Sequence, residues 1–106
     1  MDYCYFNVTC KNAEEATKIA RLLLDKKLVV CAKQIPISSD YWWDGNIEHT
    51  NEIMLTMEGR EDLFDAVESE LQQSHSYETF VLEMIPVKRV SAKAQKWMQD
   101  NLKLVQ

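Results

Sequence analysis

Hydrophobic and polar residues alternate near the start of the chain, and this alternation predicts a β-strand over residues 3–10. Successive side chains of a strand point to opposite faces, so Cys4, Phe6 and Val8 would share one face. Tyr3 would lie on the other face. The strand is therefore expected to pack one side against a core and to present an aromatic side that needs cover.

A helix is predicted next, because the apolar residues that follow recur at intervals of three and four. They are Ala16, Ile19, Ala20, Leu23 and Leu24. Asn12 followed three residues later by Glu15 is typical of a capping box, in which each side chain accepts a hydrogen bond from the other residue's backbone N–H. The helix is expected to end near Lys27.

Two long β-rich segments flank the dipeptide Asp44-Gly45, which is a strong signal for a tight hairpin turn. The arms would cover residues 28–43 and 46–58, and Gly59 would interrupt the second arm. Strands average about five to six residues, and an isolated two-stranded ribbon is only marginally stable in water. A ribbon of this length would extend beyond a small sheet, so we expect its tip to lie on a second copy of the chain.

The remaining chain predicts a second helix from about Glu61, a strand over residues 80–87 and a terminal helix that begins at Ser91. The order β-α-β-β-α-β plus a C-terminal helix is the split arrangement of ferredoxin-like α+β proteins. Residues 1–106 are expected to form one domain of this class. The buried seam of the terminal helix would contain Ala94, Trp97, Met98 and Leu102.

The charge of the chain limits its partners. It has a net charge of −5 and an isoelectric point near 5.0. Nucleic-acid binding depends on neutralising phosphates with Lys and Arg, so this acidic chain is not expected to bind nucleic acid. Its charge is compatible with metal cations. No apolar stretch approaches the ~20 residues of a membrane span, so no membrane contact is expected.

The cysteines and the first residues predict a cytoplasmic location. Cys4, Cys10 and Cys31 form an odd and sparse set, which indicates a reducing compartment rather than a disulfide framework. The chain begins without the charged segment and apolar run of a signal peptide. A longer precursor from which this chain is trimmed stays an open alternative.

The most specific motif is the run over residues 41–48, Tyr-Trp-Trp-Asp-Gly-Asn-Ile-Glu, joined by His-Ser-Tyr-Glu-Thr over residues 75–79. With residues 28–32 and Ile35-Pro36, these motifs resemble the CutA family of divalent-cation tolerance proteins over nearly the whole chain. The resemblance implies a ferredoxin-like fold and a homotrimer whose hairpins extend across neighbouring subunits. It also implies binding of copper or other divalent ions in metal homeostasis, with no metal required for folding and no catalytic reaction.

The candidate metal ligands are Cys10, His75 and Glu78. The resemblance implies the first two, while the family's third ligand, an acid, is replaced here by Val81. Glu78 is a candidate because acids beside the sheet can bind a hard divalent ion. A thiolate near a helix N-terminus would have a lowered pKa and could bind a soft metal.

Each of these ligands has a structural alternative. Free cysteines usually behave as small buried hydrophobes, so Cys10 could be a core residue. His75 could cap helical carbonyls or be solvated. Glu78 could belong to a solvated face or form a salt bridge with Lys88 or Arg89.

A group of mainly aromatic residues is expected at the subunit interface, because Trp and Tyr dominate interface hot spots. The group comprises Tyr41, Trp42, Trp43, Ile47 and Tyr77. Its aromatic members could alternatively line a pocket between subunits for a small ligand. Replacing Trp43 by alanine tests the interface interpretation, which predicts dissociation of the oligomer.

Two other functions remain open, a trimeric module that senses a small molecule and a trimeric scaffold in which metal binding is incidental. An acylphosphatase of the same fold would need a phosphate-binding loop with an arginine after the first strand. Residues 10–12, Cys-Lys-Asn, contain neither Gly nor Arg. A copper chaperone would need a C-x-x-C pair at the same place, where only Cys10 is present.

Overall fold

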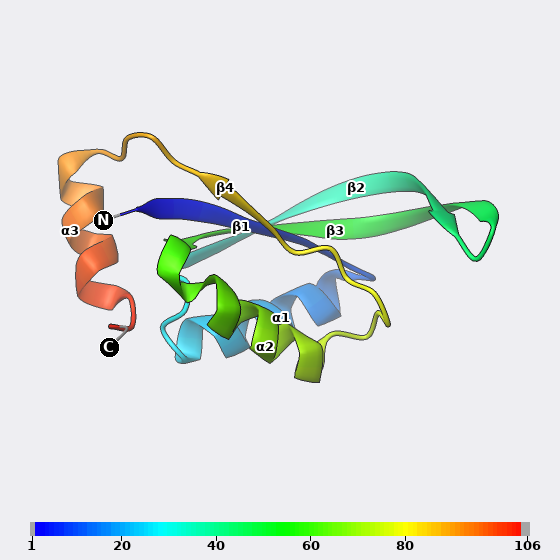
Figure 1. Cartoon of the computed structure of the whole chain (residues 1–106), viewed down its shortest axis with the longest axis horizontal. Coiled ribbons are helices and arrows are strands. Elements are labelled where there is room, and N and C mark those ends of the chain that lie inside the picture. Colours follow the sequence, from blue (N-terminus) through cyan, green and yellow to red (C-terminus); the bar gives the residue numbers. More distant parts are fainter. Residues whose placement is uncertain (1, 105–106) are drawn as a thin grey trace.

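A four-stranded antiparallel sheet with two helices on one face forms the body of the molecule, and a long hairpin projects from it (Figure 1). The computed structural model describes residues 2–104. The strands are β1 (Tyr3–Cys10), β2 (Cys31–Trp43), β3 (Asn46–Arg60) and β4 (Glu83–Pro86). The helices are α1 (Ala13–Asp25), α2 (Phe64–Ser74) and α3 (Ala92–Asn101), with a short helix η1 (Glu61–Leu63) before α2.

The strand order β2-β3-β1-β4 confirms the predicted ferredoxin-like α+β arrangement. Helices α1 and α2 lie side by side under the sheet (Figure 1). β1 is central, and its predicted inner face is buried, since Phe6 is 0% and Val8 1% exposed. Leu23 of α1 and Leu71 of α2 complete the same core. The alternating pattern of β1 is therefore explained by helices that cover one side of it.

The start of α1 carries the predicted cap, with one difference. Asn12 Oδ1 accepts a hydrogen bond from the Glu15 backbone N–H at 2.9 Å, as a capping box requires. The Glu15 carboxylate accepts from the N–H of Lys11 at 3.1 Å, one residue before the expected Asn12. The helix ends at Asp25, with Lys26 as its C-cap. The cap therefore joins α1 to the end of β1.

The hairpin is about as long as the sequence predicts, although its first arm begins at Cys31 rather than at residue 28. Asp44 and Gly45 both have positive φ, 52° and 78°, which is the geometry of a tight two-residue turn. β3 pairs with β1 only from Ile53 to Arg60, whereas β2 and β3 continue to pair with each other as far as the turn. Residues 37–52 therefore form a two-stranded ribbon beyond the sheet, and the molecule extends 45 Å along its longest axis.

Gly59 does not interrupt β3 as predicted, because the strand continues to Arg60. It allows the Phe6 ring to approach the backbone. A Cβ atom at position 59 would lie 2.6 Å from Cε2 of Phe6 and 3.1 Å from the Leu28 carbonyl oxygen. Gly59 is therefore needed because the ring of a core side chain lies directly against the backbone of the strand.

We expect Gly59→Ala to lower the free energy of unfolding by about 1–3 kcal/mol, the usual cost of overpacking a core. Chemical denaturation measures this change. The double variant Gly59→Ala with Phe6→Leu provides the control, since a shorter side chain at position 6 leaves room for the new methyl group. The double variant should lose less stability than the two single losses added together. Additive losses would show that the ring contact is not the cause.

The last strand is shorter than predicted, covering Glu83–Pro86 rather than residues 80–87. The ring of Phe80 stacks on His75, with centroids 5.4 Å apart and an angle of 22° between the planes. This contact keeps the first residues of the expected strand at the end of α2. Pairing with β1 begins only where Glu83 faces Asn7.

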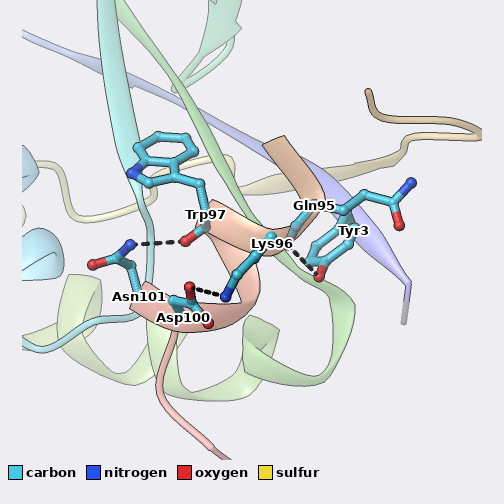
Figure 2. Close-up of polar contacts among 6 residues, drawn as sticks. All are labelled: Tyr3, Gln95, Lys96, Trp97, Asp100 and Asn101. Atoms are coloured by element: carbon cyan, nitrogen blue, oxygen red, sulfur yellow. Dashed lines mark hydrogen bonds and ion pairs between the residues drawn. The ribbon is translucent and has the colours of Figure 1, made fainter. Parts of the chain in front are cut away.

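Helix α3 covers the aromatic side of β1 at the end of the sheet opposite the hairpin tip (Figure 1). Tyr3 is 7% exposed, and its hydroxyl donates to the Gln95 carbonyl at 3.3 Å (Figure 2). Met98 and Leu102 are buried as predicted, but Trp97 is 45% exposed and points away from Tyr3. Within residues 2–104, no helix is long and apolar enough to cross a membrane.

Candidate metal centre

Three side chains that can ligate a metal meet where β1 ends, α1 begins and α2 ends. Cys10 is the last residue of β1, Glu15 lies in the first turn of α1, and His75 is the C-cap of α2. One ligand atom from each residue can be chosen so that all three lie within 4.8 Å of one another. The structure therefore brings together two predicted ligands, Cys10 and His75, with an acid that the sequence did not assign.

The Cys10 thiol differs from the prediction. Burial, followed by the charges of Glu15 and Glu52, raises its pKa to about 12. The sequence predicted a lowered pKa from the nearby helix N-terminus, and that prediction was wrong because the side chain is 0% exposed and faces two acids. At neutral pH the thiol keeps its proton, and a metal ion would have to replace it.

His75 is fixed by two hydrogen bonds. Its Nδ1 accepts from the Tyr77 backbone N–H at 3.0 Å, and its Nε2 lies 2.8 Å from the Thr9 carbonyl oxygen. Since an N–H can only donate and a carbonyl can only accept, the neutral ring carries its proton on Nε2. Metal binding through Nδ1 would replace the bond from Tyr77, while the bond to Thr9 would continue to orient the ring.

The Glu15 carboxylate is hydrogen-bonded to the two segments that flank it, the end of β1 and the loop after α2. Its Oε1 accepts from the Lys11 N–H at 3.1 Å and its Oε2 from the Ser76 N–H at 3.0 Å. Burial alone would raise the pKa of this carboxyl, but the hydrogen bonds from Ser76 and Lys11 and the neighbouring His75 lower it. A carboxylate has about four acceptor positions, so it can hold both N–H groups and still face a cation.

The sequence did not point to Glu15 as a site residue because the capping box already explained it. The available signal was an acid five residues after a candidate cysteine, on the helical turn that follows the strand. Its contact with Ser76 spans 61 residues, and no periodicity predicts such a pairing.

Glu78 occupies a different place from the other two predicted ligands. It is exposed on the loop after His75, and the ligand group formed by the described residues contains Cys10, Glu15 and His75. Val81, which stands where the resemblance implies an acid, is 61% exposed. A metal role for Glu78 stays a prediction.

The predicted interface aromatics gather around a second feature, a cleft of about 660 Å³ between the hairpin and the loop that follows His75. It is lined by Thr9, Ser39, Tyr41, Trp42, Trp43, Glu52, Ser76, Tyr77, Glu78, Thr79 and Val81. Ile47 faces Trp42 across the two strands near the tip, and these side chains are 66% and 72% exposed. The interface role of these residues stays a prediction.

The strand order, the projecting hairpin and the thiol–imidazole–carboxylate group define a small ferredoxin-like α+β protein with a candidate cation site. The sequence pattern of the CutA1 divalent ion tolerance protein family matches residues 4–101. The chain therefore belongs to the CutA family. This family is named for tolerance to divalent ions and not for a chemical reaction.

Some known relatives are similar over nearly their whole length, whereas the chain spans about half the length of the rice and mammalian relatives. The divalent-cation tolerance protein CutA of Archaeoglobus fulgidus is 34% identical over 98 residues, which are 92% of this chain and 96% of that protein. The structure of the periplasmic divalent cation tolerance protein CutA from the same organism matches with a TM-score of 0.92 at 33% identity, covering 95% of this chain and 99% of that one. CutA1 from Oryza sativa matches with a TM-score of 0.93 at 27% identity, covering 97% and 95%.

Proposed function

We propose that the chain is a non-enzymatic homotrimer that binds copper or another divalent ion at Cys10, Glu15 and His75 in metal homeostasis. The observation that carries this proposal is the approach of the three ligand atoms to within 4.8 Å. In this chain Glu15 would supply the carboxylate that the family's pattern places at position 81. Family membership supports the link to cation tolerance.

The chemistry of the ligand set suits ions of intermediate softness. Thiolate sulfur, imidazole nitrogen and carboxylate oxygen together are typical of zinc and divalent copper rather than of magnesium or calcium. A bound ion would be attracted directly to the charged carboxylate of Glu15. It would be attracted to Cys10 once that thiol has lost its proton and become a thiolate. Because the pKa of Cys10 is raised to about 12, binding should release close to one proton for each ion at neutral pH.

The homotrimer is supported by the ribbon formed by residues 37–52, which pairs only with itself in the described chain. Trp42 and Ile47 leave a large apolar surface on this ribbon, and such a surface is typical of an interface. The family resemblance provides the number three. Hairpins that cover neighbouring subunits would bury these side chains.

The cytoplasmic location stays a prediction. The rice relative is named as chloroplastic, and the Archaeoglobus fulgidus structure is described as periplasmic. We propose the cytoplasm because the thiols Cys4, Cys10 and Cys31 are all free in the structure.

Native mass spectrometry during titration with zinc and copper under reducing conditions tests the metal site. We expect one ion per chain in a trimer. Cys10→Ser and Glu15→Gln should each weaken binding by more than the roughly 10–100-fold that loss of an outer-shell partner costs. Calorimetry in buffers of different ionisation enthalpy should report close to one proton released per ion, and Cys10→Ser should abolish that release.

Two matched variants identify the ligands. Cys31→Ser changes a half-buried thiol outside the group, and Glu78→Gln changes the acid that the sequence predicted. Both should bind the metal as the unaltered protein does. If Glu78→Gln loses affinity for the metal and Glu15→Gln does not, then Glu78 is the metal ligand and Glu15 is not. No saturable uptake by the unaltered protein would overturn the proposed function.

A further inference from the structure

The cleft beside the hairpin adjoins the candidate metal centre, and all of its walls belong to one chain. Ser39, Tyr41 and Trp43 alternate along β2, so their side chains lie on one face of the ribbon. Glu52 lies on the same face, because it pairs with Ile37 in the same alternating set. The cleft volume of about 660 Å³ falls within the range of small-molecule sites, roughly 300–1,000 Å³.

Glu52 gives the cleft its electrostatic character. It is only 7% exposed although it lines the cleft, and it forms no ion pair within residues 2–104. Its Oε2 accepts a hydrogen bond from the Tyr77 hydroxyl at 2.5 Å. A carboxylate buried without a counter-ion is costly, and a bound cation would supply one.

The remaining lining residues favour an organic cation over a bare metal ion. Aromatic rings attract cations through their faces, and aromatic walls are the usual means of recognising ammonium groups. Tyr41, Trp43 and Tyr77 provide such rings. The exposed carboxylate of Glu78 adds negative charge at the same cleft, and none of its lining residues is Lys, Arg or His.

We propose that this cleft binds a small organic ammonium ion, held by Glu52 and by the rings of Tyr41, Trp43 and Tyr77. The ammonium group would take the place of the missing counter-ion, and its methyl or methylene groups would contact the rings. This proposal does not require a metal ion at Cys10, Glu15 and His75. It requires only that a neighbouring subunit leave the cleft open.

Amide and indole NMR of the full chain, titrated with tetramethylammonium chloride at constant ionic strength, tests the proposal. The indole signals of Trp42 and Trp43 report on the cleft, and that of Trp97 reports on α3. We expect the signal of Trp43 to shift saturably, while Trp97, which is on α3 at the other end of the molecule, stays unchanged. tert-Butanol, a neutral molecule of similar size and shape, should bind at least about tenfold more weakly, since it lacks the charge.

Two variants test whether the charge that binds the ammonium ion is that of Glu52. Glu52→Gln should weaken tetramethylammonium binding at least about tenfold, whereas Asp65→Asn, which removes an exposed charge in the first turn of α2, should leave it unchanged. No saturable shift of Trp43, equal binding of tert-butanol, or full binding by a folded Glu52→Gln would each overturn the proposal. If Glu52→Gln fails to fold, the comparison of the charged and neutral probes on the unaltered protein decides the matter.

Discussion

Replacing Glu15 by alanine is expected to lower the free energy of unfolding by about 3 kcal/mol. The carboxylate accepts hydrogen bonds from the N–H groups of Lys11 and Ser76, and bonds to a charged group contribute about 1.5–3 kcal/mol each. Removing it also frees the end of β1 from the loop after α2. Chemical denaturation of the two proteins at pH 7 measures the difference.

Glu14→Ala is the matched control for this change. Glu14 lies in the same first turn of α1 and has the same favourable position relative to the helix dipole, but it is exposed. Its replacement should cost no more than about 0.5–1 kcal/mol. Equal losses in Glu14→Ala and Glu15→Ala would show that only the dipole matters and that the bridge between elements contributes nothing.

The pH profile gives a second measurement for Glu15. The pKa of its carboxyl is lowered in the folded protein from the ordinary 4.5. A lowered folded-state pKa means that the charged form stabilises the fold above 4.5, and that this stabilisation is lost as the pH falls through the folded-state value. The gap in stability between the unaltered protein and Glu15→Ala should therefore shrink as the pH falls below about 4.5. A gap that stays constant over this range would contradict the charged role.

Local patterns predicted most of the fold. The alternation over β1 identified the face that α1 and α2 cover, because an open sheet with helices on one side requires it. The Asp44-Gly45 pair predicted the hairpin turn, since both positions need positive φ. Asn12 predicted the start of α1 to the residue. Each of these features depends on residues that are close together in the chain, and it can therefore be predicted from the local sequence.

Contacts between distant segments escaped prediction. β4 begins later than expected because Phe80 stacks on His75, and β3 passes through Gly59 because the Phe6 ring needs that space. The pKa of Cys10 is raised rather than lowered as predicted, since the thiol is buried and two acids from other elements face it. The sequence identified Cys10 and His75 through a family resemblance, but only the folded chain places Glu15 between them.

The aromatic run over residues 41–43 was predicted as an interface, and the structure places all three residues on the cleft that Glu52 also lines. Successive side chains of a strand alternate, so one aromatic run can contact a neighbouring subunit through one face of the ribbon and a ligand through the other, although the side chain of Trp42 also borders the cleft. Trp42 and Ile47 belong to one such face, while Tyr41 and Trp43 belong to the other.

Trp42→Ala is expected to dissociate the proposed trimer into monomers at micromolar concentration. Trp42 is 72% exposed in the isolated chain and faces Ile47 across the hairpin, so the pair forms an apolar surface suited to a neighbouring subunit. Truncating a tryptophan at the centre of an interface costs about 2–4 kcal/mol, and each subunit of a trimer would lose one. Since every 1.4 kcal/mol is about tenfold in affinity, the assembly constant should fall by several orders of magnitude.

Sedimentation velocity of the unaltered protein and of two variants measures this effect. Trp97→Ala is the matched control, because it removes an exposed tryptophan from α3, at the opposite end of the molecule from the hairpin. It should sediment as a trimer, while Trp42→Ala should sediment as a folded monomer with unchanged far-ultraviolet circular dichroism. The sheet does not need the tip of the ribbon for its own core, so loss of the interface should leave the fold intact. A Trp42→Ala protein that remains trimeric would exclude this surface as the interface, and an unaltered protein that sediments as a monomer would refute the trimer itself.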